Sequence, residues 1–92
     1  MKEIIEANYK SIVDRGLIDP YYTTGADFFV KLREETSELI NAYYDYDDEG
    51  IKEELADVIM VCLNMAKHYD IDIEQEIKNK IKINEQRAKN GK

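Results

Sequence analysis

Hydrophobic residues recur along the chain at the three- and four-residue spacing of amphipathic helices, and strand-type alternation is absent. A first helix is predicted from about Lys2 to Arg15, with Gly16 as its stop. A second begins near Thr24 to Asp27, where the two side chains have the spacing of a capping box, and runs to about Tyr44. The first half of the chain is therefore expected to contain two helices separated by a loop.

The second half predicts two more helices with short connections. A third covers about Ile51 to Tyr69, after the break in DYDDEG, and a fourth is capped by Asp72 and runs to about Ala88. Apolar residues of the fourth helix form one stripe, namely Ile73, Ile77 and Ile81. We therefore expect an all-α, four-helix bundle-like domain that spans residues 1–92 as a single unit.

Composition adds an expectation about assembly and location. A chain of 92 residues buries only about two-thirds of its surface, so self-association is expected to complete the bundle. The only cysteine, Cys62, lies in an apolar run and is expected to be buried, which favours a reducing compartment. The N-terminus carries acidic residues, and no apolar run is long enough to span a bilayer. We expect a cytoplasmic protein that does not contact a membrane.

Charge is distributed unevenly. The net charge of −7 argues against nonspecific binding to nucleic acid. The C-terminal end is nevertheless basic, because only Glu85 opposes six basic residues, which are Lys78, Lys80, Lys82, Arg87, Lys89 and Lys92. An acidic body with a basic end suits a cation and the anion that it neutralises, although a solvated helix tail has the same pattern.

Carboxylates occur on the apolar face of the second helix. At 100° per residue, Glu35 is centred on that face, Glu38 borders it, Lys31 lies near Glu35, and Glu34 projects about 100° away. The apolar residues within about 60° of Glu35 are Phe28, Leu32, Leu39, Ala42 and Tyr46. This helix is therefore expected to carry an acidic pair into the interior.

The third helix repeats the arrangement. It is apolar almost all round from residue 55 to residue 66, which indicates a buried helix, and Glu54 and Asp57 share one face. Val61, Asn64 and His68 continue that stripe. Converging buried carboxylates are costly, and oxygen-only ligands suit Mg²⁺ or Mn²⁺, so we expect a metal site in preference to surface or salt-bridged acids.

Three motifs together resemble one family. The sequence EETSE at 34–38, followed by ELAD at 54–57, is similar to the EExxE and ExxD pair of the MazG-like, all-α nucleoside triphosphate pyrophosphohydrolases. The segment KIKINEQR contributes the KxxxNxxR spacing of that family's phosphate-contacting helix. The resemblance covers about residues 28–87.

The resemblance implies a helical homodimer or dimer of dimers that uses Mg²⁺ to hydrolyse a nucleoside triphosphate between its α and β phosphates. It implies that Glu34 and Glu38 are catalytic. The metal ligands that it implies are Glu35, Glu38, Glu54 and Asp57. The implied phosphate-binding residues are Lys80, Asn84 and Arg87.

Further substrate contacts are expected along the same faces. Candidates are Lys31, Asn64 and His68, although a histidine on a buried helix is more often a satisfied core residue. Base recognition in such folds often uses aromatic stacking, and the candidates are Tyr21, Tyr22, Tyr43 and Tyr44, for which packing is the alternative role.

The sequence is also compatible with two other functions. Phosphoribosyl-ATP pyrophosphohydrolase is a close relative in fold, size and acidic motifs, and is ranked second because KxxxNxxR and the loop around Pro20 look more like the MazG side. A non-enzymatic acidic helical module that binds a basic partner is the third possibility. A Nudix hydrolase is disfavoured, since its pattern requires an apolar residue where Glu35 stands.

Overall fold

The computed structural model describes residues 1–91 and contains four helices: α1 (Lys2–Asp14), α2 (Gly25–Tyr44), α3 (Asp48–His68) and α4 (Ile73–Lys89). These residues include no strand, so the predicted all-α class is confirmed. The largest difference from the expected bounds is at α3, which begins at Asp48 instead of about Ile51. Lys92, the last of the six basic C-terminal residues, lies outside the described part of the chain.

The predicted helix ends rest on local hydrogen bonds. At the start of α2, the Thr24 backbone N–H donates to Asp27 Oδ2 at 2.8 Å, as expected for the capping box. At the start of α4, Asp72 Oδ1 accepts from the Gln75 backbone N–H at 3.1 Å. α1 ends at Asp14, and Gly16 follows with a φ of 73°, a backbone conformation that glycine adopts without steric cost.

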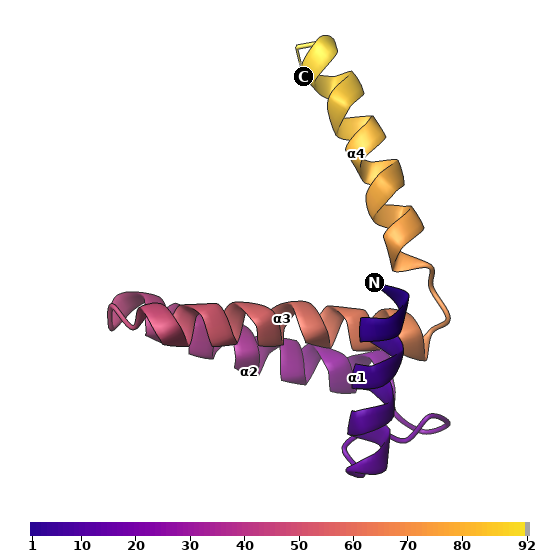
Figure 1. Ribbon diagram of the computed structural model, residues 1–92, viewed down its shortest axis with the longest axis vertical. Helices are drawn as coiled ribbons and strands as arrows, with labels where there is room; N and C mark the ends of the chain where they lie inside the picture. Colours follow the sequence, from indigo (N-terminus) through magenta and orange to yellow (C-terminus); the bar gives the residue numbers. More distant parts are fainter. Residues whose placement is uncertain (92) are drawn as a thin grey trace.

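α2 and α3 form an antiparallel hairpin joined by a short turn at residues 45–47 (Figure 1). Phe28 and Ala42 on the predicted apolar face of α2 are buried, and Leu32 and Leu39 on that face are half-buried. Tyr46 was wrongly assigned to the same face. It follows the end of α2 in a left-handed conformation with φ of 55° and is 90% exposed.

α3 is buried on only part of its circumference. Val61, Leu63 and Ala66 are buried, whereas Leu55 and Cys62 are exposed. The predictions of a fully buried third helix and of a buried cysteine are therefore wrong for the single chain. The reason is that only α2 and α1 pack extensively against α3, which leaves one apolar side uncovered.

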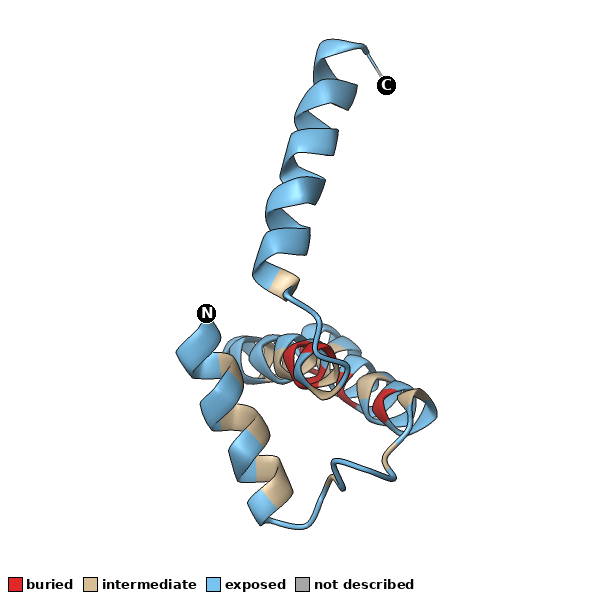
Figure 2. Cartoon of the chain, turned by 90° about the vertical axis from the view of Figure 1, so that its right-hand side faces the viewer, coloured by how far each residue is buried: buried red, intermediate tan, exposed pale blue. Residues whose placement is uncertain are grey.

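α4 projects away from the other three helices and makes no extended contact with them within residues 1–91 (Figure 1). Its surface is exposed beyond its first residue (Figure 2), and the predicted stripe includes Ile77 and Ile81 with about half of their surface exposed. Among residues 1–91, the apolar face of α4 thus has no partner. None of the described helices combines the length and hydrophobicity that crossing a membrane requires.

α1 crosses the end of the hairpin and is attached to α3 by polar contacts. Asn8 Nδ2 donates to Asn64 Oδ1 at 2.7 Å. His68 joins three segments, because Nε2 donates to the Thr23 carbonyl at 2.7 Å and Nδ1 is hydrogen-bonded to the Tyr9 hydroxyl at 2.8 Å. A carbonyl oxygen can only accept, so Nε2 carries a proton in this contact. The histidine therefore holds α1 and the loop before α2 against α3.

Replacing His68 tests this structural role. His68→Leu removes both hydrogen bonds and leaves the Thr23 carbonyl and the Tyr9 hydroxyl unpaired, so we expect the free energy of unfolding to fall by about 2–3 kcal/mol. Tyr9→Phe removes one of these hydrogen bonds together with the hydroxyl group, so the free energy of unfolding should fall by about 1 kcal/mol. Urea denaturation followed by circular dichroism measures both. Glu53→Ala at an exposed position of α3 is the control, and a His68→Leu cost no larger than that control's would contradict the assignment.

Candidate active site

Three carboxylates from two helices meet on one side of the hairpin. Glu35 and Glu38 on α2 and Glu54 on α3 each place an oxygen within 4.8 Å of the others. Glu35 is only 6% exposed, Glu54 is half-buried and Glu38 is exposed. Among the described residues, Glu35 Oε2 and Glu54 Oε2 are buried and have no hydrogen-bond partner. Buried oxygens in this state are costly, which makes the cluster a candidate site for a cation.

The fourth expected ligand, Asp57, is not brought into this cluster. It is exposed, as is Glu38, so the expectation that both acidic pairs enter the interior is wrong for one member of each pair. Residues three apart on a helix differ by about 60° in direction, so two acids can share a side of a helix without both facing its neighbour. The structure thus unites three of the four predicted ligands.

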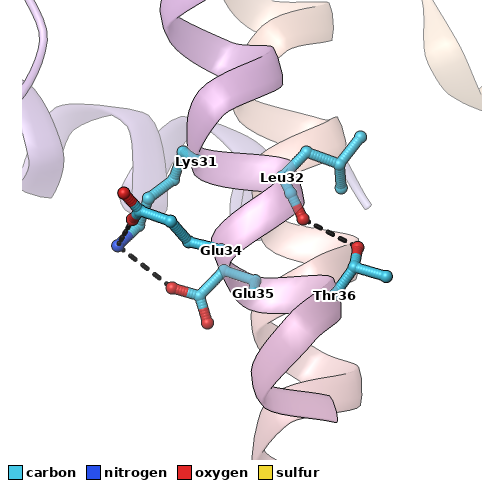
Figure 3. Close-up of polar contacts among 5 residues, drawn as sticks. All are labelled: Lys31, Leu32, Glu34, Glu35 and Thr36. Atoms are coloured by element: carbon cyan, nitrogen blue, oxygen red, sulfur yellow. Dashed lines mark hydrogen bonds and ion pairs between the residues drawn. The ribbon is translucent and has the colours of Figure 1, made fainter. Parts of the chain in front are cut away.

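Lys31 lies between two of the neighbouring acids. Its Nζ is 3.0 Å from Glu35 Oε1 and 3.7 Å from Glu34 Oε2. Figure 3 shows these three side chains together on one side of α2, while Thr36 turns away and donates to the Leu32 carbonyl at 2.7 Å. Lys31 therefore neutralises part of the negative charge at the edge of the cluster.

The surroundings shift the pKa values of Glu35 and Glu54 in opposite directions. The ammonium of Lys31 lowers the pKa of Glu35, against the effect of burial. The adjacent Glu38, burial and Glu35 together raise the pKa of Glu54 to about 7. At neutral pH, the cluster without a cation consequently holds a proton on Glu54 in a large fraction of molecules.

A cleft of about 300 Å³ lies beside the cluster. Lys31 and Glu34 line it at α2, Asn64 lines it at α3, and its walls are otherwise mainly apolar. The apolar wall comprises Ile12, Leu17, Ile18, Phe28, Val30 and Val61. The volume is at the lower end of the range of about 300–1,000 Å³ for small-molecule pockets, so the cleft suits one compact ligand.

Other predicted site residues lie elsewhere. Lys80, Asn84 and Arg87 are on α4, away from the three carboxylates of their own chain (Figure 1). Both ring nitrogens of His68 are occupied by Tyr9 and Thr23. The four tyrosine candidates are exposed, and none of them lines the cleft.

Sequence reasoning missed the wall that α1 and the following loop contribute to the cleft. Ile12, Leu17 and Ile18 line it, and Asn8 reaches Asn64 across 56 positions of the sequence. The apolar spacing of α1 indicated an inward face, but no motif connects that face to the acids. These residues can be found only from the packing of α1 on α3.

The fold and the cluster define the class: an all-α protein whose helical hairpin gathers carboxylates beside a small cleft. The MazG-like family model matches residues 30–92, more than half of the chain, and the protein belongs to this family. This confirms the resemblance inferred from the acidic motifs. Comparisons with curated proteins and with solved structures found no match.

The raised pKa of Glu54 predicts a pH dependence of stability in metal-free buffer. Between the ordinary pKa of 4.5 and the raised pKa of about 7, the folded chain retains a proton at Glu54 that the unfolded chain has lost. The free energy of unfolding should therefore fall as pH rises through this window, and Glu54→Gln should remove that contribution.

Thermal unfolding at intervals from pH 4.5 to 8 measures the effect. Glu53→Gln, at the adjacent exposed position, is the matched control and should keep the wild-type profile. A Glu54→Gln profile that coincides with wild type across the window would contradict the raised pKa.

Proposed function

We propose that this protein is a Mg²⁺-dependent nucleoside triphosphate pyrophosphohydrolase that releases a nucleoside monophosphate and pyrophosphate. The observation that carries the proposal is the cluster of three carboxylates with two buried, unpaired oxygens beside a cleft of nucleoside size. The membership of the MazG-like family supports the same reaction class, because both acidic motifs lie within the matched residues.

The donor set fits Mg²⁺, with Mn²⁺ as a substitute. Glu35, Glu38 and Glu54 offer only oxygen, without the nitrogen or sulfur ligands that favour zinc. Asp57 follows one turn along α3 and is the candidate for a further ligand. When bound, the cation would withdraw charge from the phosphates and lower the pKa of water.

The residues of the cleft supply the other parts of the reaction. Glu34 lines the cleft and lies outside the three-carboxylate cluster, so we assign it as the base that accepts a proton from water. The water oxygen bonds to phosphorus as the bond to the α–β bridging oxygen breaks, and pyrophosphate leaves. We assign Lys31, which lines the same cleft, to bind a phosphate oxygen.

Phosphate binding by α4 requires a second copy of the chain in this proposal. Glu54 lies 14 residues, or about 21 Å, before the end of α3, and α4 then leads away from the hairpin (Figure 1). On α4, Lys80 and Asn84 point within about 60° of Ile77 around the helix axis. If Ile77 packs on a second chain, the neighbouring Lys80 and Asn84 reach the surface of that chain as well. A homodimer or dimer of dimers would then complete each site.

Pyrophosphate release across a panel of nucleoside triphosphates with Mg²⁺ tests the activity. We expect turnover of at least one nucleotide, and Glu34→Gln should reduce kcat by about 100-fold to 10,000-fold, as for loss of a general base. Glu53→Gln is again the exposed control. Absence of turnover for every nucleotide, phosphoribosyl-ATP included, would reject the hydrolase.

Binding of the cation can be measured independently of turnover. Mg²⁺ or Mn²⁺ at about 100 times its Kd should stabilise the fold by about 2.7 kcal/mol and raise the melting temperature, and Glu38→Gln should weaken this effect. If neither ion changes the melting temperature, the acids would instead serve structure or a basic partner, as in the alternative of an interaction module.

Mixing two inactive variants tests whether α4 acts across subunits. Arg87→Ala and Glu38→Gln should each be inactive, and unfolding and refolding them together at equal concentration should recover roughly a quarter of the wild-type activity. Half of the dimers are then mixed, and each has one intact site of two. Sedimentation should show that Ile77→Asp with Ile81→Asp is monomeric, while Lys82→Glu on the opposite face stays associated. A mixture as inactive as its parents would place each site within one chain.

A further inference from the structure

The wall of the cleft contains one buried polar side chain on α3. Asn64 is 7% exposed and lines the cleft among apolar neighbours that include Phe28 and Val61. A buried amide in such a setting is stable only when its polar atoms are paired. The partners of Asn64 therefore indicate what the cleft is built to hold.

Asn8 fixes the direction of this amide. Its Nδ2 donates to Asn64 Oδ1 at 2.7 Å, which occupies the oxygen on the α1 side. No hydrogen bond from Asn64 Nδ2 to another residue occurs among residues 1–91. Nδ2 is not among the fully buried unpaired atoms of these residues, so its N–H is open to the cleft, where a ligand acceptor would be its partner.

The position of Asn64 relative to the carboxylates fits a nucleotide lying along α3. Asn64 follows Glu54 by ten residues, or about 15 Å of helix. Lys31 and Glu34 line the same cleft nearer the cluster. A nucleotide with its phosphates at the carboxylates would direct its base, and the edge of the base farthest from the sugar, towards Asn64.

We propose that Asn64, oriented by Asn8, recognises the base of the nucleotide by donating from Nδ2 to a keto oxygen at the edge farthest from the sugar. Bases with a keto group there, such as uracil and hypoxanthine, are bound in preference to the corresponding amino bases, cytosine and adenine. An amino group at that point would meet the N–H of Asn64 and leave two donors facing each other. This specificity rests on the proposed function, since it places the phosphates at the carboxylate cluster.

The family match covers Asn64 but not Asn8. The family match begins at residue 30, so Asn8, most of the α1 and loop wall and Phe28 lie before it. The acidic motifs and the α4 residues, by contrast, lie inside the match. The proposed contact with the base thus combines a residue inside the match with an orienting residue outside it.

Binding of nucleoside monophosphates tests the specificity without requiring turnover. Two matched pairs differ at the relevant edge: UMP against CMP, and IMP against AMP. NMR titration followed at backbone amides of residues that line the cleft, which every variant keeps, should give an affinity about tenfold higher for the keto member of at least one pair, the effect of one neutral hydrogen bond. Asn64→Asp replaces the donor with an acceptor, so the keto-to-amino ratio should invert even if the added charge weakens all binding. Asn8→Ala should bring the ratio closer to one.

Asn41→Asp makes the same change at an exposed position of α2 and should leave the ratio unaltered. Equal affinity within both pairs, preference for the amino bases, no binding of any monophosphate, or a ratio that Asn64→Asp leaves unchanged would each overturn the proposal. Discriminating binding without hydrolysis of any triphosphate would reject the hydrolase and retain the recognition by Asn64. Hydrolysis at equal kcat/KM for keto and amino substrates would retain the hydrolase and reject the recognition by Asn64.

Discussion

α2 and α3 pack antiparallel to each other, and every buried side chain of residues 1–91 belongs to one of these two helices. The same contact brings Glu54 opposite Glu35 and Glu38. α1 then packs against α3 and adds a wall to the cleft, whereas α4 takes no part. The hairpin therefore supplies both the apolar core and the cluster of acids, and a change in its register would alter the two together.

The carboxylate cluster in this small core requires a positive charge or a proton to offset its repulsion. Two carboxylate oxygens are buried without a partner, and Lys31 neutralises only one edge of the cluster. A proton on Glu54 relieves part of the repulsion, and a divalent cation would relieve more of it by pairing with several oxygens at once. In the proposed hydrolase, stability and activity are thus coupled at the same three side chains.

The features that could be predicted from the sequence are those that depend on residues close together along the chain. Gly16, Thr24 and Asp72 mark helix ends through local geometry, and the spacing of Glu35 placed it correctly on the apolar face of α2. Prediction from the sequence failed where burial depends on what covers a face, as for the exposed Asp57 and Cys62. Spacing along one helix defines which residues share a side, but it contains no information on how far a neighbouring helix extends over that side.

The contact between α2 and α3 and the contacts of α1 differ in how far apart along the chain their residues lie, and this affects folding. α2 and α3 are connected by a turn of a few residues, so bringing their faces together closes a short loop. The hydrogen bonds of α1 instead join residues separated by 56 and 59 positions. Short-range contacts form first in small helical proteins because their entropic cost is lower. The carboxylate cluster can therefore assemble early with the hairpin, and the cleft beside it exists only after α1 docks.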